Sequence, residues 1–302
     1  MNRRTFLHRT ALIGAAGWLA RSPLFAQTAA LQGPADAFHP LRRNVGYFTG
    51  RGGTIGWLVN ADALAIVDTQ FPETATQCRD GLPGRAGRMI DVVLNTHHHR
   101  DHTSGNGVFK AAARTIVAHA NVPRLQRVGV ENPDAVVVAD ETFETSWRRE
   151  LGDEVVTATY FGAAHTSGDA IIHFENANVV HMGDLTFNRL YPYIDRPAGA
   201  DIRHWITVLE TAVKTYPKDA IYVFGHGSAR FGVEGTQGDL LVFRDYLSGL
   251  LDYVSGRIAA GDSRESIVAL ENLPGFPDFH QPLPNRLGLN LGVAYDELTD
   301  KG

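Results

Sequence analysis

The sequence predicts an α/β fold in which two sheets pack face to face, with helices on the outside. The first observation behind this prediction is that short apolar runs alternate with helical segments through most of the chain. The second is an internal echo: the order strand–Asp, helix, strand–His occurs over 65–97 and again over 181–226. Loops at strand ends are where such folds place chemistry, so we expect one site at the edge that the two sheets share.

The elements follow in order from local patterns. Turn residues at 50–53 and 60–62 separate the first strands, and β-branched residues dominate the strand over 89–94. The expected strands are 45–48, 53–59, 63–67, 89–94, 115–118, 155–161, 170–174, 179–182 and 220–224. The expected helices are 73–82, 105–113, 202–215 and 240–260. The helix over 202–215 has the clearest periodicity of apolar side chains.

No linker divides these elements, so we predict one domain over 41–302, preceded by a Pro- and Gly-containing segment over 27–40. Residues 1–26 read as a signal peptide: a basic head is followed by an apolar stretch shorter than the ~20 residues that span a bilayer. Arg3-Arg4 followed by Phe-Leu resembles a twin-arginine signal. We expect a periplasmic or secreted protein exported by that route, with an ordinary secretory signal as the alternative.

Charge and cysteine content narrow the partners. Removal of Arg3, Arg4, Arg9 and Arg21 with the signal takes the formal net charge from −5 to about −9. Such a protein has little electrostatic reason to bind nucleic acid or an anionic membrane, so we expect a small-molecule substrate. Cys78 is the only cysteine, which excludes a disulfide within the chain.

Four stretches carry residues that bind metals. The densest is an H-x-H-x-D-H cluster over 97–102, and single residues follow in Ala-His-Thr, Met-Gly-Asp and Gly-His-Gly contexts. Together they supply His97, His99, Asp101, His102, His165, Asp184 and His226. A catalytic zinc ion takes about four ligands, one of them water, so seven protein ligands suit a pair of ions.

Spacing suggests how the ligands divide. One ion would take His97, His99 and His165, and the other Asp101, His102 and His226, while the two oxygens of Asp184 could bridge the ions. Imidazole and carboxylate ligands without thiolate suit zinc and also iron, manganese or cobalt. We expect two zinc ions per chain and leave iron and manganese open.

In this order, the motifs resemble those of the metallo-β-lactamase superfamily, over nearly the whole chain after residue 41. The resemblance implies an αβ/βα four-layer sandwich of two mixed sheets with outer helices and a dinuclear site at one sheet edge. It implies the same division of the seven ligands. It also matches Asp68 to an aspartate that orients a metal-binding histidine.

The chain departs from the zinc β-lactamases at two positions. Asp184 stands where those enzymes carry a cysteine or no ligand, as in hydrolases of the glyoxalase II and lactonase type. Phe187 stands where a substrate-binding lysine often follows. We find no clear glutathione-binding set of Lys and Arg, and little room for the C-terminal helical domain of glyoxalase II.

The expected activity is zinc-dependent hydrolysis of an ester, thioester, lactone or amide. A hydroxide between the metals attacks the acyl carbonyl, and Asp101 is the catalytic residue that orients the attacking water and accepts its proton. The alternatives are β-lactam hydrolysis, a mono-iron redox enzyme of the sulfur dioxygenase type, and a non-catalytic binding protein.

Two segments bear on the substrate. Arg189, Tyr191 and Tyr193 follow Asp184 on a loop, where aromatic rings could wall a pocket and Arg189 could bind a substrate carboxylate. The alternative is a loop that packs on its own body. Residues 272–302 could form a lid, pack on the domain or mediate pairing. Substrate identity and oligomeric state stay open.

Overall fold

The computed structural model describes residues 37–299. The predicted signal peptide over 1–26 and most of the segment over 27–40 lie outside the described residues. Among residues 37–299, no helix is both long and apolar enough to span a bilayer.

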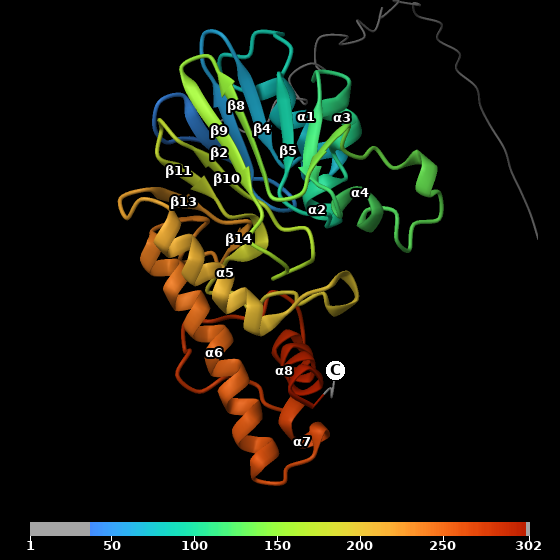
Figure 1. Cartoon of the computed structure of the whole chain (residues 1–302), viewed down its shortest axis with the longest axis vertical. Helices are drawn as coiled ribbons and strands as arrows, with labels where there is room; N and C mark the ends of the chain where they lie inside the picture. The colour runs from blue at the N-terminus through green and yellow to red at the C-terminus, as the bar shows by residue number, and fades with distance from the viewer. Residues whose placement is uncertain (1–36, 300–302) are drawn as a thin grey trace, which may run out of the picture.

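Two sheets form the upper part of the molecule in Figure 1. The first has seven strands in sequence order, antiparallel from β1 to β4 and parallel from β4 to β7. These strands are β1 (Phe38–Pro40), β2 (Val45–Phe48), β3 (Ile55–Val59), β4 (Leu64–Val67), β5 (Val92–Asn95), β6 (Ile116–His119) and β7 (Glu141–Phe143). The first sheet is therefore mixed.

The second sheet has six strands in the order β15-β13-β11-β10-β9-β8 and is also mixed, with β11 and β13 parallel. Its strands are β8 (Ser146–Leu151), β9 (Glu154–Thr159), β10 (Ile171–Phe174), β11 (Val179–His181), β13 (Ile221–Val223) and β15 (Glu234–Gly235). A short parallel pair, β12 (Phe187–Asn188) with β14 (His226–Gly227), lies beside the site.

Helices cover both outer faces. The elements associated with the first sheet are α1 (Pro72–Gly81), α2 (Arg100–Thr103), α3 (Asn106–Lys110) and α4 (Val122–Leu125). The later helices are α5 (Ile202–Thr215), α6 (Gln237–Ala259), α7 (Arg264–Val268) and α8 (Arg286–Thr299). Short 3-10 turns cover 133–135, 183–185 and 196–198. Helices outside two mixed sheets confirm the predicted four-layer α/β sandwich.

Three apolar clusters hold these layers together. The inner cluster joins Leu58 and Leu94 of the first sheet to Phe174 of the second. An outer cluster packs α1 and α3 on the first sheet through Cys78 and Phe109. Each fully buried Leu or Phe contributes about 1.5–3 kcal/mol to folding. Together the two clusters cover both faces of the first sheet.

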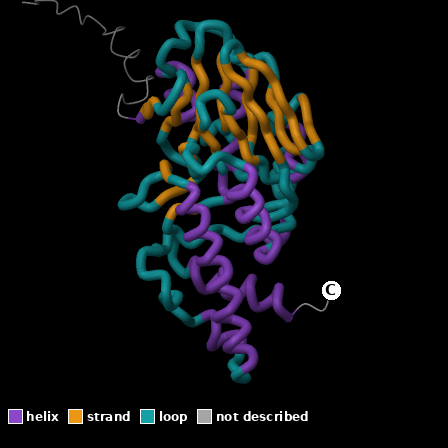
Figure 2. Tube along the Cα trace, turned by 60° about the vertical axis from the view of Figure 1, so that its left-hand side comes forward, coloured by secondary structure: helices purple, strands orange, loops and turns teal. Residues whose placement is uncertain are grey.

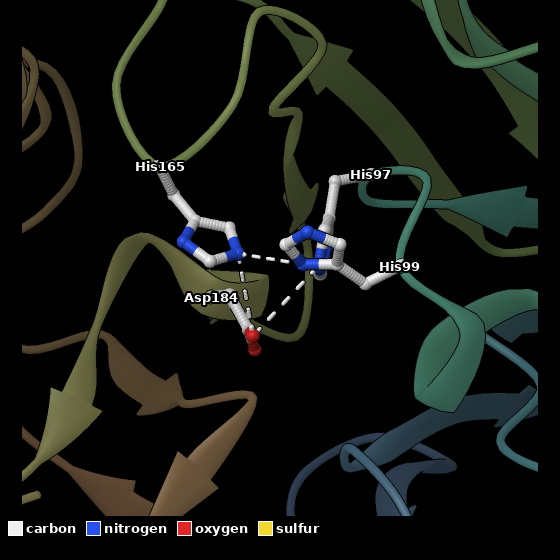
Figure 3. A group of neighbouring side chains, drawn as sticks. All are labelled: His97, His99, His165 and Asp184. Carbon is white, nitrogen blue, oxygen red and sulfur yellow. Dashed lines mark hydrogen bonds and ion pairs between the residues drawn. The ribbon is translucent and has the colours of Figure 1, made fainter. Parts of the chain in front are cut away.

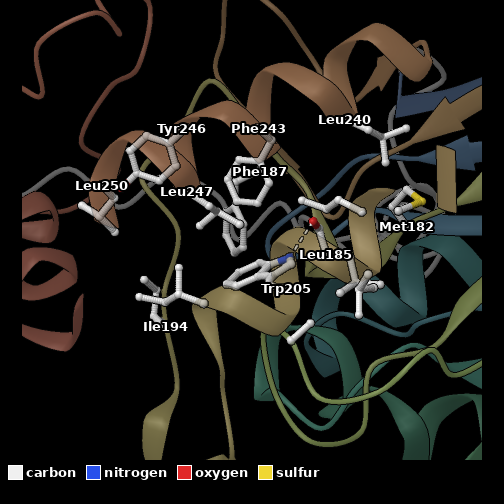
Figure 4. Close-up of a cluster of buried hydrophobic side chains, with 14 of the residues drawn as sticks. Met182, Leu185, Phe187, Ile194, Trp205, Leu240, Phe243, Tyr246, Leu247 and Leu250 are labelled. Atoms are coloured by element: carbon white, nitrogen blue, oxygen red, sulfur yellow. Dashed lines mark hydrogen bonds between the residues drawn. The ribbon is translucent and has the colours of Figure 1, made fainter. Parts of the chain in front are cut away.

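The third cluster joins the second sheet to the C-terminal helices. In Figure 4, Trp205 of α5 packs beside Phe243 of α6, and its indole donates to the Leu185 carbonyl at 3.0 Å. Tyr246 continues the contact along α6. The loop that carries Asp184 is therefore fixed against two helices.

The C-terminal helices occupy more of the chain than the sequence suggested. Helices α6, α7 and α8 extend below the sandwich in Figures 1 and 2 and pack on one another. The expected helix over 240–260 matches α6, but the sequence analysis predicted no helix after it, where the structure has α7 and α8. Helix α8 has buried residues at Leu287, Leu291 and Ala294, the spacing of an amphipathic helix.

The hairpin β8–β9 contains a strand that the sequence analysis missed. Its charged run Trp-Arg-Arg-Glu hides an alternation: Trp147 and Leu151 are buried while Arg148 is exposed. The pairing with β9 covers all of Ser146–Leu151. Period-two burial, rather than apolar content, marks this strand.

Candidate metal centre

The candidate metal centre lies where several strands end at one edge of the sandwich. Asp68 follows β4, His97 follows β5 by two residues, and His226 follows β13 by three. Asp184 lies in the 3-10 turn after β11, and His165 lies in the loop between β9 and β10. The fold brings together all seven residues that we expected to bind metal.

Two glycines let the chain approach this closely. Gly225 precedes His226, and a Cβ there would lie 2.0 Å from the Asp184 Oδ1 atom. Gly183 precedes Asp184 at φ +52°, a left-handed conformation that glycine adopts without strain. The Met-Gly-Asp and Gly-His-Gly motifs therefore need glycine because side chains would fill the site.

The first group of candidate ligands is His97, His99, His165 and Asp184, shown in Figure 3. The His99 Nδ1 atom lies 3.0 Å from His97 Nε2 and 2.9 Å from His165 Nε2. The Asp184 Oδ2 atom lies 3.7 Å from His97 Nε2 and 3.5 Å from His165 Nε2. Three ring nitrogens and one carboxylate oxygen thus face a common point.

The second group is Asp101, His102 and His226. The His226 Nε2 atom lies 3.0 Å from Asp101 Oδ2 and 3.3 Å from His102 Nε2. The other oxygen of Asp184, Oδ1, lies 3.0 Å from His102 Nε2 and 3.5 Å from His226 Nε2. Asp184 therefore presents one oxygen to each group.

The nitrogen and oxygen atoms of these two groups are better placed to bind metal ions than to hydrogen-bond with one another. Neutral imidazole nitrogens that face each other can share only one proton per hydrogen bond, so some are left with unused lone pairs. The buried Asp184 Oδ1 atom forms no well-aligned hydrogen bond among the described residues, although His102 Nε2 lies 3.0 Å from it. Imidazole and carboxylate are ligands that zinc, iron and manganese accept. The chain's residues therefore fit a pair of divalent ions.

Asp68 and Thr96 orient two of these rings. The Asp68 Oδ2 atom lies 2.7 Å from His102 Nδ1, and it also accepts from the Thr96 hydroxyl at 2.7 Å. That hydroxyl lies 3.0 Å from His97 Nδ1. Both rings are thus held with Nε2 toward the centre, which is how a buried carboxylate directs a metal-binding histidine.

Asp195 is a residue that sequence reasoning missed. Its Oδ2 atom lies 2.9 Å from His99 Nε2, and 3.6 Å from Nε2 of the neighbouring His98. Asp195 also accepts from the Ala198 amide, which fixes it at the start of a 3-10 turn. Asp195 lies in no recognisable motif. Its position two residues after Tyr193, a residue expected at the pocket, could have pointed to it.

Burial and charge separate the protonation of the two groups. Burial lowers the pKa of His97 well below its usual value and lowers the pKa of His165 to about 3. Burial also acts to lower the pKa of His102 and His226, but nearby carboxylates, Asp184 first, outweigh it and raise both. When no ion is bound, His97 and His165 are therefore neutral, whereas His102 and His226 hold protons.

Asp101 is ionised despite its surroundings. Burial raises its pKa, but the charge of His102 and the hydrogen bond from His226 outweigh that effect and lower the pKa to about 2. Its side chain keeps 32% exposure, and it lines a pocket. A carboxylate here can accept a hydrogen bond from water or substrate.

The three expected substrate contacts separate in the structure. Tyr191 and Tyr193 line the pocket beside Asp184 and His226. Arg189 does not line it, because its guanidinium binds the Asp239 carboxylate at 2.6 Å and stacks on Phe231. For Arg189 the prediction of a substrate carboxylate contact is therefore wrong, and the alternative of packing on the protein's own body holds, because its charge is already paired with Asp239.

Relatives with known names match part of the chain. A hydroxyacylglutathione hydrolase from Methylococcus capsulatus is 32% identical over 125 residues, 41% of this chain and 43% of the relative. One from Maricaulis maris is 27% identical over 105 residues, 34% of this chain and 36% of the relative. The chain thus spans less than half the length of these curated relatives.

Solved structures share the fold. The sec-alkyl sulfatase PisA1, as a double mutant, superimposes with a TM-score of 0.64 at 15% identity, over 88% of this chain and 50% of that chain. A metallo-β-lactamase from Hirschia baltica gives a TM-score of 0.54 at 18% identity, over 70% and 96%. The family description "Metallo-beta-lactamase superfamily" matches residues 48–226, more than half of the sequence. The resemblance found in the sequence is confirmed: the chain belongs to the metallo-β-lactamase superfamily.

Proposed function

We propose that the protein is an exported metal-dependent hydrolase that cleaves an acyl bond. The observation that carries this proposal is the shared position of Asp184, whose two oxygens face two separate groups of ligands. Such a site suits two ions better than one. The ions would be held by His97, His99 and His165 on one side and by Asp101, His102 and His226 on the other.

Two bound ions would supply a water of lowered pKa as nucleophile and would polarise the acyl carbonyl. The chain's own residues set the geometry for this chemistry. Asp68, through His102 and Thr96, holds two rings with Nε2 toward the centre. Asp101 faces the pocket as a carboxylate, so it can accept a hydrogen bond from the attacking water and hold it in line.

A thioester or ester is the substrate bond that we favour. Relatives named hydroxyacylglutathione hydrolase support the thioester. Asp184 at the bridging position and the apolar Phe187 in the pocket are the features by which the chain departs from zinc β-lactamases, so they argue against a β-lactam. We further propose zinc as the metal and export by the twin-arginine route, on the ligand types and on Arg3-Arg4.

The test combines metal analysis with turnover. The purified mature protein is assayed against acyl esters, thioesters, lactones and β-lactams, alongside His97→Ala and, as a matched control, His39→Ala. His39 is a histidine of β1 outside the metal centre. We expect about two ions per chain and hydrolysis in wild type and control, with both reduced in His97→Ala.

Other results would overturn the proposal. Full activity in a His97→Ala protein that has lost its metal would exclude metal-dependent hydrolysis. About one iron per chain together with an oxygen requirement would favour the redox alternative. A β-lactam as the sole fast substrate would favour β-lactamase activity.

A further inference from the structure

A pocket of about 410 Å³ adjoins the second ligand group. Asp101, Asp184 and His226 line it, together with His99 of the first ligand group. Its other walls are largely apolar and come from two segments that are distant in sequence: Phe187, Leu190, Tyr191, Tyr193, Pro282 and Leu283. This size suits a small organic molecule whose reacting bond lies at the metal centre.

The outer wall is fixed in place by backbone pairing. The Tyr191 amide donates to the His280 carbonyl at 3.0 Å, and the His280 amide donates to the Arg189 carbonyl at 3.0 Å. Phe279 stacks against both Tyr191 and Tyr246, with its ring centroid 6.1 Å from the first and 4.7 Å from the second. Of the roles considered for the 272–302 segment, its first part therefore packs on the domain and walls the pocket.

Two apolar side chains on this wall are exposed. Tyr193 is 44% exposed and Leu283 is 57% exposed. Among the large hydrophobic side chains that are exposed within residues 37–299, these two alone line this pocket. Apolar groups at the mouth of a metal site gain free energy when a ligand covers them, which favours a substrate with an apolar body.

The pocket also contains a cation with no counter-ion. Arg286, the first residue of α8, is half-buried, and its guanidinium lies 5.1 Å above the Tyr193 ring. Within the described part of the chain, no acidic side chain forms an ion pair with it. Burial lowers its pKa. Arg100 lines the same pocket but is exposed, so water screens its charge.

An unpaired guanidinium beside apolar walls is a binding group for an anion. Partial burial strengthens its attraction for a carboxylate, and its fork of N–H donors fits two carboxylate oxygens. The cation–π contact with the Tyr193 ring holds the Arg286 guanidinium in position. The role once expected of Arg189 is thus available to Arg286, whose charge is free to meet a ligand.

We propose that the substrate is an amphipathic anion: an apolar acyl compound whose distal end carries an anionic group bound by Arg286. This proposal rests on the proposed hydrolase function, and it names the substrate class for that site. The acyl bond lies at the metal centre, the apolar body lies against Tyr193 and Leu283, and the anion lies at the N-terminus of α8.

The test uses two esters of equal chain length on the metal-loaded protein. Nitrophenyl hexanoate ends in a methyl group, and mono-nitrophenyl adipate ends in a carboxylate. We expect wild type to give the higher kcat/KM for the adipate ester. Arg286→Gln should lower that value by roughly 10- to 100-fold, the range for a charged hydrogen bond, and change the hexanoate value little.

Two further variants control this experiment. Arg203→Gln removes an exposed arginine of α5 outside the pocket, and we expect both esters to be cleaved as by wild type. Arg286→Lys keeps the charge and should restore part of the preference for the adipate ester. Equal losses for both esters in Arg286→Gln, with an unchanged melting temperature, would overturn the proposal.

The outcome for the substrate class is separable from the outcome for hydrolysis. If wild type cleaves neither ester, the proposed function fails for these substrates, and calorimetric binding of phenylhexanoate and of phenylhexanol decides the present proposal. Tighter binding of the anion by wild type, lost in Arg286→Gln and kept in Arg203→Gln, supports it. Equal affinity for the two ligands, or a preference that survives in Arg286→Gln, refutes it.

Discussion

The two groups of candidate ligands differ in burial although they share Asp184. In the first group, the His97 and His165 side chains are at most 1% exposed. In the second, the Asp101 and His226 side chains are 32% and 25% exposed. An ion in the first group would be the more shielded, because His97 and His165 are buried and only His99, 15% exposed, and the shared Asp184 line the pocket. An ion in the second group would lie beside the more exposed Asp101 and His226, which line the same pocket. The first position suits retention of the metal, and the second suits contact with substrate.

The largest effect should come from removing one ligand of each group. His226→Ala removes one ligand of the more exposed group. We expect such a variant to retain about one of about two ions per chain. His165→Ala opens the buried group, where the remaining donors are His97, His99 and Asp184, and we expect retention to fall further. Metal analysis after dialysis against a chelator measures both. Equal loss in the two variants would break the comparison.

A smaller effect should come from the carboxylates that hold the rings. Asp68→Asn weakens the support of His102 and, through Thr96, of His97, so it should lower metal affinity in both groups by roughly 100-fold. Asp195→Asn acts on His99 and should lower affinity by roughly 10-fold, in the first group alone. Asparagine tolerates the left-handed backbone at Asp68.

Competition titrations with a chromophoric chelator resolve the two affinities. Asp68→Asn should weaken both binding steps and Asp195→Asn only the tighter one. If Asp195→Asn weakened both steps, His99 would serve the two groups rather than one.

The smallest effect concerns the loss of folding stability at acid pH, which His173, a residue outside the metal centre, should cause independently of metal loss. His173 of β10 has an unpartnered Nε2 atom and packs on the Tyr216 ring, and burial lowers its pKa from 6.5 to about 4. Between these values the unfolded chain binds more protons than the folded chain, so stability falls as the pH drops from 6.5 toward 4. His173→Gln should remove this dependence.

The magnitude can be bounded. Discounted for its partial exposure, His173 should contribute about 1 kcal/mol to the difference in unfolding free energy between pH 7 and pH 5. Urea unfolding of metal-loaded wild type and His173→Gln at the two pH values measures it. If this difference in unfolding free energy were the same in His173→Gln as in wild type, other groups would cause the acid response. Metal content at pH 5 would then be measured next.

The metal centre was readable from the sequence for a physical reason. Each candidate ligand follows an apolar run that ends at the same sheet edge, so order along the chain encodes proximity in space. His97 after β5 and His226 after β13 are the clearest cases. His98, which lies between the two ligands of the H-x-H cluster, approaches the same Asp195 oxygen that His99 contacts.

The substrate wall was not readable in the same way. Arg189 pairs with Asp239, fifty residues later, and no local pattern announces such a contact. Arg286 was overlooked because its importance depends on Tyr193, which helix packing brings beneath it. Strand β8 was missed because its charged residues masked the alternation of burial. Contacts between distant segments, rather than residue types, decide these features.

The pairing of His280 with the loop after Asp184 has a consequence for how the protein can diversify. The candidate metal ligands all lie within residues 97–226, whereas Leu283 and Arg286 of the pocket belong to a later stretch that two main-chain hydrogen bonds of His280 join to the loop after Asp184. Replacements around Leu283 and Arg286 can therefore change the shape and charge of the pocket while leaving every candidate metal ligand in place.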